Sequence, residues 1–170
     1  MKTLTYIFGF AALLVWISSV QAKDKKNILL LQALANLFYA LYYYLLDYPS
    51  TALMNMISVM RCLVFAKSTQ LKKQPHVIFL IIFILFIIID GTLYTKSILD
   101  FLPLIATILY TISGWVKSTN TLRYTYIICA CIFSYYNYNA GAYIPLIGNI
   151  GELISGTISI IRFNKKATHK

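Results

Sequence analysis

The sequence predicts an all-α membrane protein with seven transmembrane helices, from its composition, its apolar runs and the placement of its charges. Of its 170 residues, 59% are hydrophobic and 12% are charged, whereas about 25% of residues are charged in soluble domains. Apolar runs occupy residues 4–22, 28–46, 50–67, 77–94, 98–116, 121–139 and 143–163. Each is close to the roughly 20 residues that a helix needs to cross a bilayer. We expect helices, because a helix pairs its own backbone groups in lipid.

The first run could be a secretory signal peptide or a retained transmembrane helix. A lysine, an apolar core and Val20-Gln21-Ala22 resemble a signal with its cleavage site. Charge favours the retained helix. If residues 4–22 stay, 12 basic residues fall on one side of the membrane, and only Lys2 and Lys96 fall on the other. Because Lys and Arg concentrate on the cytoplasmic side, we expect the N-terminus outside and the C-terminus in the cytoplasm.

The second run carries polar side chains on one face. Gln32, Asn36 and Tyr39 lie three to four residues apart, which places them on the same side of a helix. Buried polar groups of this kind either line a path or bond neighbouring helices together. The tyrosines at 42–44 are typical of an interfacial aromatic belt.

A polar stripe in the third run recurs in the seventh. Thr51, Asn55, Ser58 and Cys62 stand 94 positions before Pro145, Asn149, Glu152 and Gly156. Both sets follow the spacing of a single helix face. We therefore predict two matched bundles that meet at a polar midplane. Arg61, near the cytoplasmic end of its run, either extends to that interface or forms an ion pair with Glu152.

The fourth run differs from the others because residues 77–89 contain no polar side-chain atom. A helix that is apolar all round suits lipid rather than a pore. We predict a first three-helix bundle at residues 1–70, a linker helix at 71–97, and a second three-helix bundle with a basic tail at 98–170. Because the linker crosses the membrane once, both bundles run in the same direction, as a parallel repeat.

The second predicted bundle has its own special positions. Pro103 could act as a hinge, or it could simply occupy the first turn of a helix. Tyr136 and Asn137 belong to a polar, tyrosine-rich helix end that matches the one at 42–44. Glycines in the last run are expected to allow close helix packing.

Several function classes lack the residues that they need. Three cysteines inside apolar runs and two histidines make no metal-ligand spacing. We find no phosphate-binding glycine loop, no nucleophile elbow and no paired carboxylates, so we expect neither an enzyme nor a cofactor. The net charge of +10 comes from short loops between apolar runs, so we expect no nucleic-acid partner.

Three motifs carry a resemblance to a known family. They are Phe101-Leu102-Pro103-Leu104-Ile105, Tyr136-Asn137-Tyr138-Asn139-Ala140-Gly141 and Ile160-Ile161-Arg162-Phe163. With them the chain resembles the YgjV family of bacterial inner-membrane proteins. Relatives often have His at the position of Tyr136 and Glu near Asn149. The resemblance implies a multi-pass protein of the bacterial inner (cytoplasmic) membrane.

The same resemblance implies a more distant kinship with SWEET and PQ-loop transporters. These have three-one-three helices, an outside N-terminus, a proline in the first helix of each bundle and a substrate-site asparagine in the third. Pro103, Asn55 and Asn149 match these features by position, whereas Gly9 stands where the first proline would be. No glutamine follows Pro103, so the PQ motif itself is absent.

Two functions remain open from the sequence. The first is a facilitative transporter of a small neutral solute, in which Asn55 and Asn149 bind hydroxyls or amides. We expect the site to include Ser58, Glu152, Gln32, Asn36, Tyr39, Tyr136 and Asn137. The alternative is a non-transporting receptor, assembly factor or complex subunit. The expected partner in both is the lipid bilayer, and a homo-oligomer or a membrane partner protein stays open.

Overall fold

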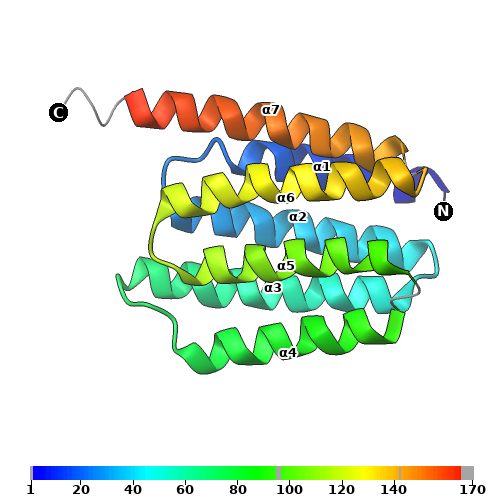
Figure 1. Cartoon of the computed structure of the whole chain (residues 1–170), viewed down its shortest axis with the longest axis horizontal. Helices are drawn as coiled ribbons and strands as arrows, with labels where there is room; N and C mark the ends of the chain where they lie inside the picture. Colours follow the sequence, from blue (N-terminus) through cyan, green and yellow to red (C-terminus); the bar gives the residue numbers. More distant parts are fainter. Residues whose placement is uncertain (1, 95–96, 142, 166–170) are drawn as a thin grey trace. The chain divides into compact units, whose positions relative to one another are not determined.

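The predicted apolar runs are helices in the computed structural model, which describes residues 2–94, 97–141 and 143–165 (Figure 1). Within these residues the chain forms seven α-helices, one 3-10 helix and no strand. They are α1 (Lys2–Ser19), α2 (Lys25–Leu45), α3 (Pro49–Gln70), α4 (Val77–Tyr94), η1 (Ile98–Asp100), α5 (Phe101–Trp115), α6 (Thr119–Asn139) and α7 (Tyr143–Lys165). The prediction of an all-helical protein is confirmed, and the fold is consistent with an all-α membrane protein.

Three segments in the described part of the chain are long and apolar enough to cross a membrane. They are Lys25–Leu45, Ile98–Trp115 and Pro145–Phe163. Two shorter helical segments, Thr3–Ser19 and Val77–Leu93, are also apolar. α3 and α6 have sufficient length, with 22 and 21 residues, but carry more polar side chains. The structure thus supports three membrane spans by length and composition among the described residues. That all seven helices cross the membrane stays a prediction.

The helix starts follow local sequence signals. Pro49 is the first residue of α3, a position that needs no backbone N–H donor. The Ser118 hydroxyl accepts a hydrogen bond from the Thr121 backbone N–H at 3.1 Å and caps α6. At η1, Asp100 Oδ2 accepts from the Ser97 N–H at 2.7 Å. These side chains satisfy backbone donors that a helix start leaves open.

Three helices end at a residue in the left-handed conformation. Asp47, Lys72 and Gly141 have φ angles of 64°, 55° and 68° after α2, α3 and α6. The N–H of Lys73 donates to Ser68 O at 3.0 Å, and that of Lys72 donates to Thr69 O at 3.1 Å. This is the Schellman pattern, which satisfies the last carbonyls of a helix.

The described helices pack as two compact units, residues 1–73 and 74–170. In the first unit, α2 packs against both α1 and α3. Ile28 and Phe65 are buried in this unit, and so are small side chains such as Ala12, Ala33 and Ala35, which let helices approach closely. The predicted division into residues 1–70, 71–97 and 98–170 is finer than these two units and stays a prediction.

In the second unit the helices pack in chain order, α4 on α5, α5 on α6 and α6 on α7. A Cβ atom at Gly91 would lie only 2.5 Å from Leu104 Cδ1, so α4 and α5 are in close contact there. The Trp115 indole N–H donates to Pro75 O at 2.8 Å, joining the end of α5 to the segment before α4. Ile81, Leu85 and other large apolar side chains of α4 are exposed, as expected for a helix that faces lipid.

Candidate functional site

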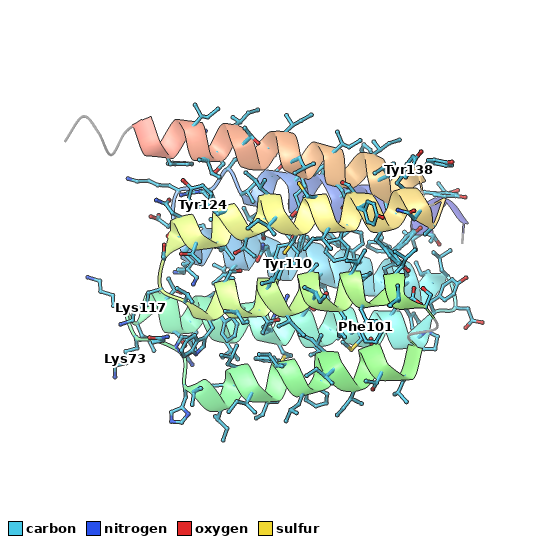
Figure 2. The ribbon with its side chains drawn as sticks, in the orientation of Figure 1. Lys73, Phe101, Tyr110, Lys117, Tyr124 and Tyr138 are labelled. Atoms are coloured by element: carbon cyan, nitrogen blue, oxygen red, sulfur yellow. The ribbon has the colours of Figure 1, made fainter. Side chains whose placement is uncertain are left out.

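The second unit encloses a carboxyl group. Glu152 of α7 is only 3% exposed, and its Oε1 accepts a hydrogen bond from the Tyr110 hydroxyl of α5 at 2.5 Å. Figure 2 labels Tyr110 in the interior part of α5, away from Phe101 at one end and Lys117 beyond the other. A carboxyl group at membrane depth costs about 2.5–3.5 kcal/mol and is usually functional. The predicted site residue Glu152 therefore lies in the core of its unit.

Aromatic rings hold Tyr110 in place. The Tyr126 ring lies edge-on to the Tyr110 ring at 5.1 Å between centroids, and the Phe133 ring stacks at 6.3 Å. Tyr126 is fully buried. Nearby, the Cys129 thiol donates to Ala106 O at 3.3 Å and joins α6 to α5. Because these neighbours restrict the Tyr110 ring, its hydroxyl is presented to Glu152 in a fixed direction.

Asn149 lies one turn before Glu152 on α7. Its Nδ2 atom is buried and has no hydrogen-bond partner in the described part of the chain. The same is true of the Ser134 hydroxyl oxygen on α6. Buried polar groups are nearly always paired, so these two atoms are the candidates in this unit for a hydrogen bond to a bound ligand.

Polar contacts mark the end of the second unit where α5 begins. The Tyr136 hydroxyl donates to Asp100 Oδ1 at 3.3 Å, joining the end of α6 to the start of α5. Asn137, next to it, is half-buried. Pro103 is the third residue of α5, within the first turn, and its carbonyl accepts from the Thr107 hydroxyl at 2.8 Å. A hinge role for Pro103 stays a prediction.

The first unit also buries a polar set. Gln32 and Asn36 of α2 are 5% and 6% exposed. Gln32 Oε1 accepts from the Cys62 thiol of α3 at 4.0 Å, and Asn36 Nδ2 donates to Gln32 O at 2.8 Å. The polar faces predicted for the second and third runs therefore meet inside the unit. Tyr39 lies further along α2, with its ring tilted at 6.5 Å from that of Tyr43.

The two predicted asparagines differ in their surroundings. Asn55 Nδ2 donates to Thr51 O of its own helix at 2.8 Å, whereas Asn149 Nδ2 has no such bond. Ser58 is half-buried, and Arg61 is buried at 8% exposure. The meeting of Asn55 with Asn149 and the ion pair of Arg61 with Glu152 would join the two units, and both stay predictions.

Tyr110, Tyr126 and Ser134 lie in or near the site, although the sequence pattern does not single them out. A weak signal existed for Tyr110, because it lies in the middle of an apolar run although Tyr favours membrane interfaces. Arg123 is one of the 12 basic residues expected on the cytoplasmic side, yet it is buried at 3% exposure, with its guanidinium 4.2 Å from the centre of the Phe163 ring. This contact is a cation–π interaction between α6 and α7.

Among the residues that the structure describes, no group of three or more His, Cys, Asp or Glu side chains is in position to hold a metal ion.

Apolar helices of membrane-spanning length that enclose buried polar side chains are typical of a helical membrane protein. A sequence model described as a bacterial inner membrane protein family, YgjV, matches residues 3–167. The chain belongs to this family and is a protein of the bacterial inner membrane. Searches of curated proteins and of solved structures found no match.

Proposed function

We propose that the protein is a facilitative transporter of a small neutral solute, built like SWEET transporters as two parallel three-helix bundles joined by α4. The observation that carries the proposal lies on α7, where the buried carboxyl of Glu152 is one turn from the Asn149 amide nitrogen, which has no hydrogen-bond partner among the described residues. Polar groups that are costly in a bilayer are kept where they bind a substrate or an ion.

The solute in this proposal binds through hydrogen bonds rather than charge. Asn149 donates from Nδ2 to a hydroxyl or carbonyl oxygen, and Asn55 offers its amide oxygen from the first bundle. Gln32, Asn36, Ser58 and the Tyr39, Tyr136 and Asn137 side chains line the path. Glu152 either carries a coupled proton or pairs with Arg61. The two bundles rock about this site, with Pro103 as the hinge.

We propose no catalytic role for these residues, because the proposed site does not pair a nucleophile with a general base. The N-terminus lies outside and the C-terminus in the cytoplasm, as the distribution of basic residues indicates. The bilayer is the required partner, and a path within one chain needs no second copy.

Solute flux into proteoliposomes tests the proposal. We expect uptake of a radiolabelled sugar, amino acid, vitamin or nucleoside, and at least a tenfold loss of that uptake in Asn149→Ala. Asn139→Ala is the matched control, because the Asn139 amide is exposed and donates to Tyr135 O of its own helix at 2.7 Å. We expect it to retain uptake.

Two results would count against the proposal. Equal uptake by Asn149→Ala and the wild-type protein would remove Asn149 from the site. No uptake across the panel, together with a stable membrane partner in a pull-down, would favour a non-transporting receptor, assembly factor or complex subunit.

A further inference from the structure

Two buried polar atoms on neighbouring helices lack a partner in the described part of the chain, and both belong to the second unit. They are the Ser134 hydroxyl oxygen on α6 and Asn149 Nδ2 on α7. α6 and α7 pack against each other and run in opposite directions, joined by the turn at Gly141. Leaving such groups unpaired costs about 1–3 kcal/mol each. Their positions relative to each other therefore decide whether one ligand group could form hydrogen bonds to both.

A contact further along the same interface sets the register. A Cβ atom at Gly156 of α7 would lie 3.1 Å from Ile127 Cγ1 of α6. The helices therefore touch where these two residues face each other. At this point α6 presents the face of Ile127 and α7 presents the face of Gly156.

Ser134 and Asn149 are each seven residues from that contact, in opposite chain directions. Seven residues are about two helical turns, so the face drifts by only about 20°. Ser134 therefore shares the face of Ile127, and Asn149 shares the face of Gly156. Because the helices are antiparallel, both steps lead to the same level, about 10.5 Å from the contact. The two unpartnered atoms belong to one level of the α6–α7 interface.

The chemistry of the pair selects a ligand group. The Asn149 amide nitrogen can only donate, whereas the Ser134 hydroxyl can donate or accept. A ligand hydroxyl satisfies both, because its oxygen accepts from Asn149 while its hydrogen is donated to Ser134. Glu152 lies three residues beyond Asn149, on the same side of α7. When this carboxyl group is ionised it repels an anionic ligand, and the subsite itself offers hydrogen bonds rather than a charge, so we expect a neutral ligand.

We infer that Ser134 and Asn149 form a binding subsite for a hydroxyl group of a neutral polyol or sugar, between α6 and α7 of the second unit. The inference rests on the proposed function and deepens it, because it names the solute class and adds Ser134 as a residue that determines specificity. The subsite lies within one unit, so it does not depend on a contact between the bundles.

The first experiment needs no ligand. A buried hydroxyl without a partner destabilises the protein, so its removal should stabilise it. We expect Ser134→Ala to raise the Tm of the purified, detergent-solubilised protein by about 2 °C or more. Thr157→Ala is the matched control, because the Thr157 hydroxyl donates to Leu153 O of its own helix at 2.8 Å. We expect it to leave the Tm unchanged or lower.

The second experiment uses D-glucose, D-xylose, myo-inositol and xylitol as probes, each added to the wild-type protein. We expect at least one probe to raise the Tm, since a ligand that binds only the folded state stabilises it. This shift should disappear in Ser134→Ala and in Asn149→Ala, and it should persist in Asn139→Ala. Glucose 6-phosphate, the anionic counterpart of the first probe, should give no shift.

Each outcome decides the inference separately from the transport proposal. A shift that is lost in both variants, without flux in proteoliposomes, supports the subsite and removes transport. Flux that is unchanged in Ser134→Ala supports transport and overturns the subsite. No shift with any neutral probe, or a lower Tm for Ser134→Ala with an undiminished probe shift, overturns the subsite as well.

Discussion

At the scale of single residues, the hydrogen bond between Tyr110 and Glu152 fixes a carboxyl group in the core of the second unit. It joins α5 to α7 across 42 positions of sequence, inside a unit whose other core side chains are mostly apolar. In such surroundings a polar group keeps its place only when its partner is held in position. The rings of Tyr126 and Phe133 hold that partner.

Tyr110→Phe removes this hydroxyl without changing the shape of the ring. Because Glu152 loses a donor in a buried place, we expect a loss of about 1–3 kcal/mol in the free energy of unfolding, measured in mild detergent. Tyr138→Phe is the control, since that side chain is 67% exposed. Equal stability of the two variants would contradict a structural role for the bond. In a Glu152→Leu background the cost of Tyr110→Phe should shrink, as a double-mutant cycle would measure.

Glu152 could be predicted from the sequence, whereas its partner could not. A carboxyl in the middle of an apolar run is unusual in any sequence, so Glu152 and the neighbouring Asn149 were expected in a polar site. Tyr110 became its partner through the rotation of α5 and α7 about their axes, which side-chain packing on α6 decides. The residue pattern of a single helix does not determine how that helix is rotated relative to its neighbours.

At the scale of elements, the apolar runs predict where the helices lie. The residues at which the helices begin and end depend on local hydrogen bonds and backbone conformation. The run at 77–94 coincides with α4 (Val77–Tyr94). The run predicted at 98–116 instead divides into η1 and α5, because the Asp100 carboxylate binds the Ser97 N–H and closes a tighter first turn. Hydropathy does not distinguish these two conformations.

The end of α3 offers a stability test at this scale. Lys72 adopts a φ of 55°, a left-handed conformation that costs about 1–2 kcal/mol for a residue with a Cβ atom. We expect Lys72→Gly to raise the free energy of unfolding by about 0.5–1 kcal/mol, because glycine adopts this conformation without strain. Thermal unfolding of the purified protein measures the change.

Lys73→Gly is the matched control for that change. Lys73 is the next residue, exposed, with no positive φ angle, so glycine there only adds freedom to the unfolded chain. We expect it to be neutral or slightly destabilising. A gain in Lys73→Gly as large as in Lys72→Gly would show that the left-handed conformation is not the cause.

At the scale of the whole molecule, the charge distribution makes a prediction that local structure does not. If all seven helices cross the bilayer, the basic loops collect on the cytoplasmic side. The turn after α2 and the turn after α6 then both lie outside, because a single crossing by α4 gives the two bundles the same direction. Membership of a bacterial inner-membrane family is compatible with this topology and with its inverse, so a direct measurement is needed.

Single cysteines in a cysteine-free background test the topology in spheroplasts with a membrane-impermeant thiol reagent. We expect Tyr48→Cys and Ala140→Cys, both at exposed positions, to react in intact spheroplasts. Lys73→Cys and Lys117→Cys, whose parent lysines are labelled in Figure 2, should react only after permeabilisation. Labelling of Tyr48→Cys and Ala140→Cys from opposite sides would contradict the parallel repeat, because the two bundles would then be inverted. Labelling of all four positions with the opposite preference would keep the repeat and reverse the orientation, so the bias of basic residues would have to act through lipid or partner binding rather than through insertion.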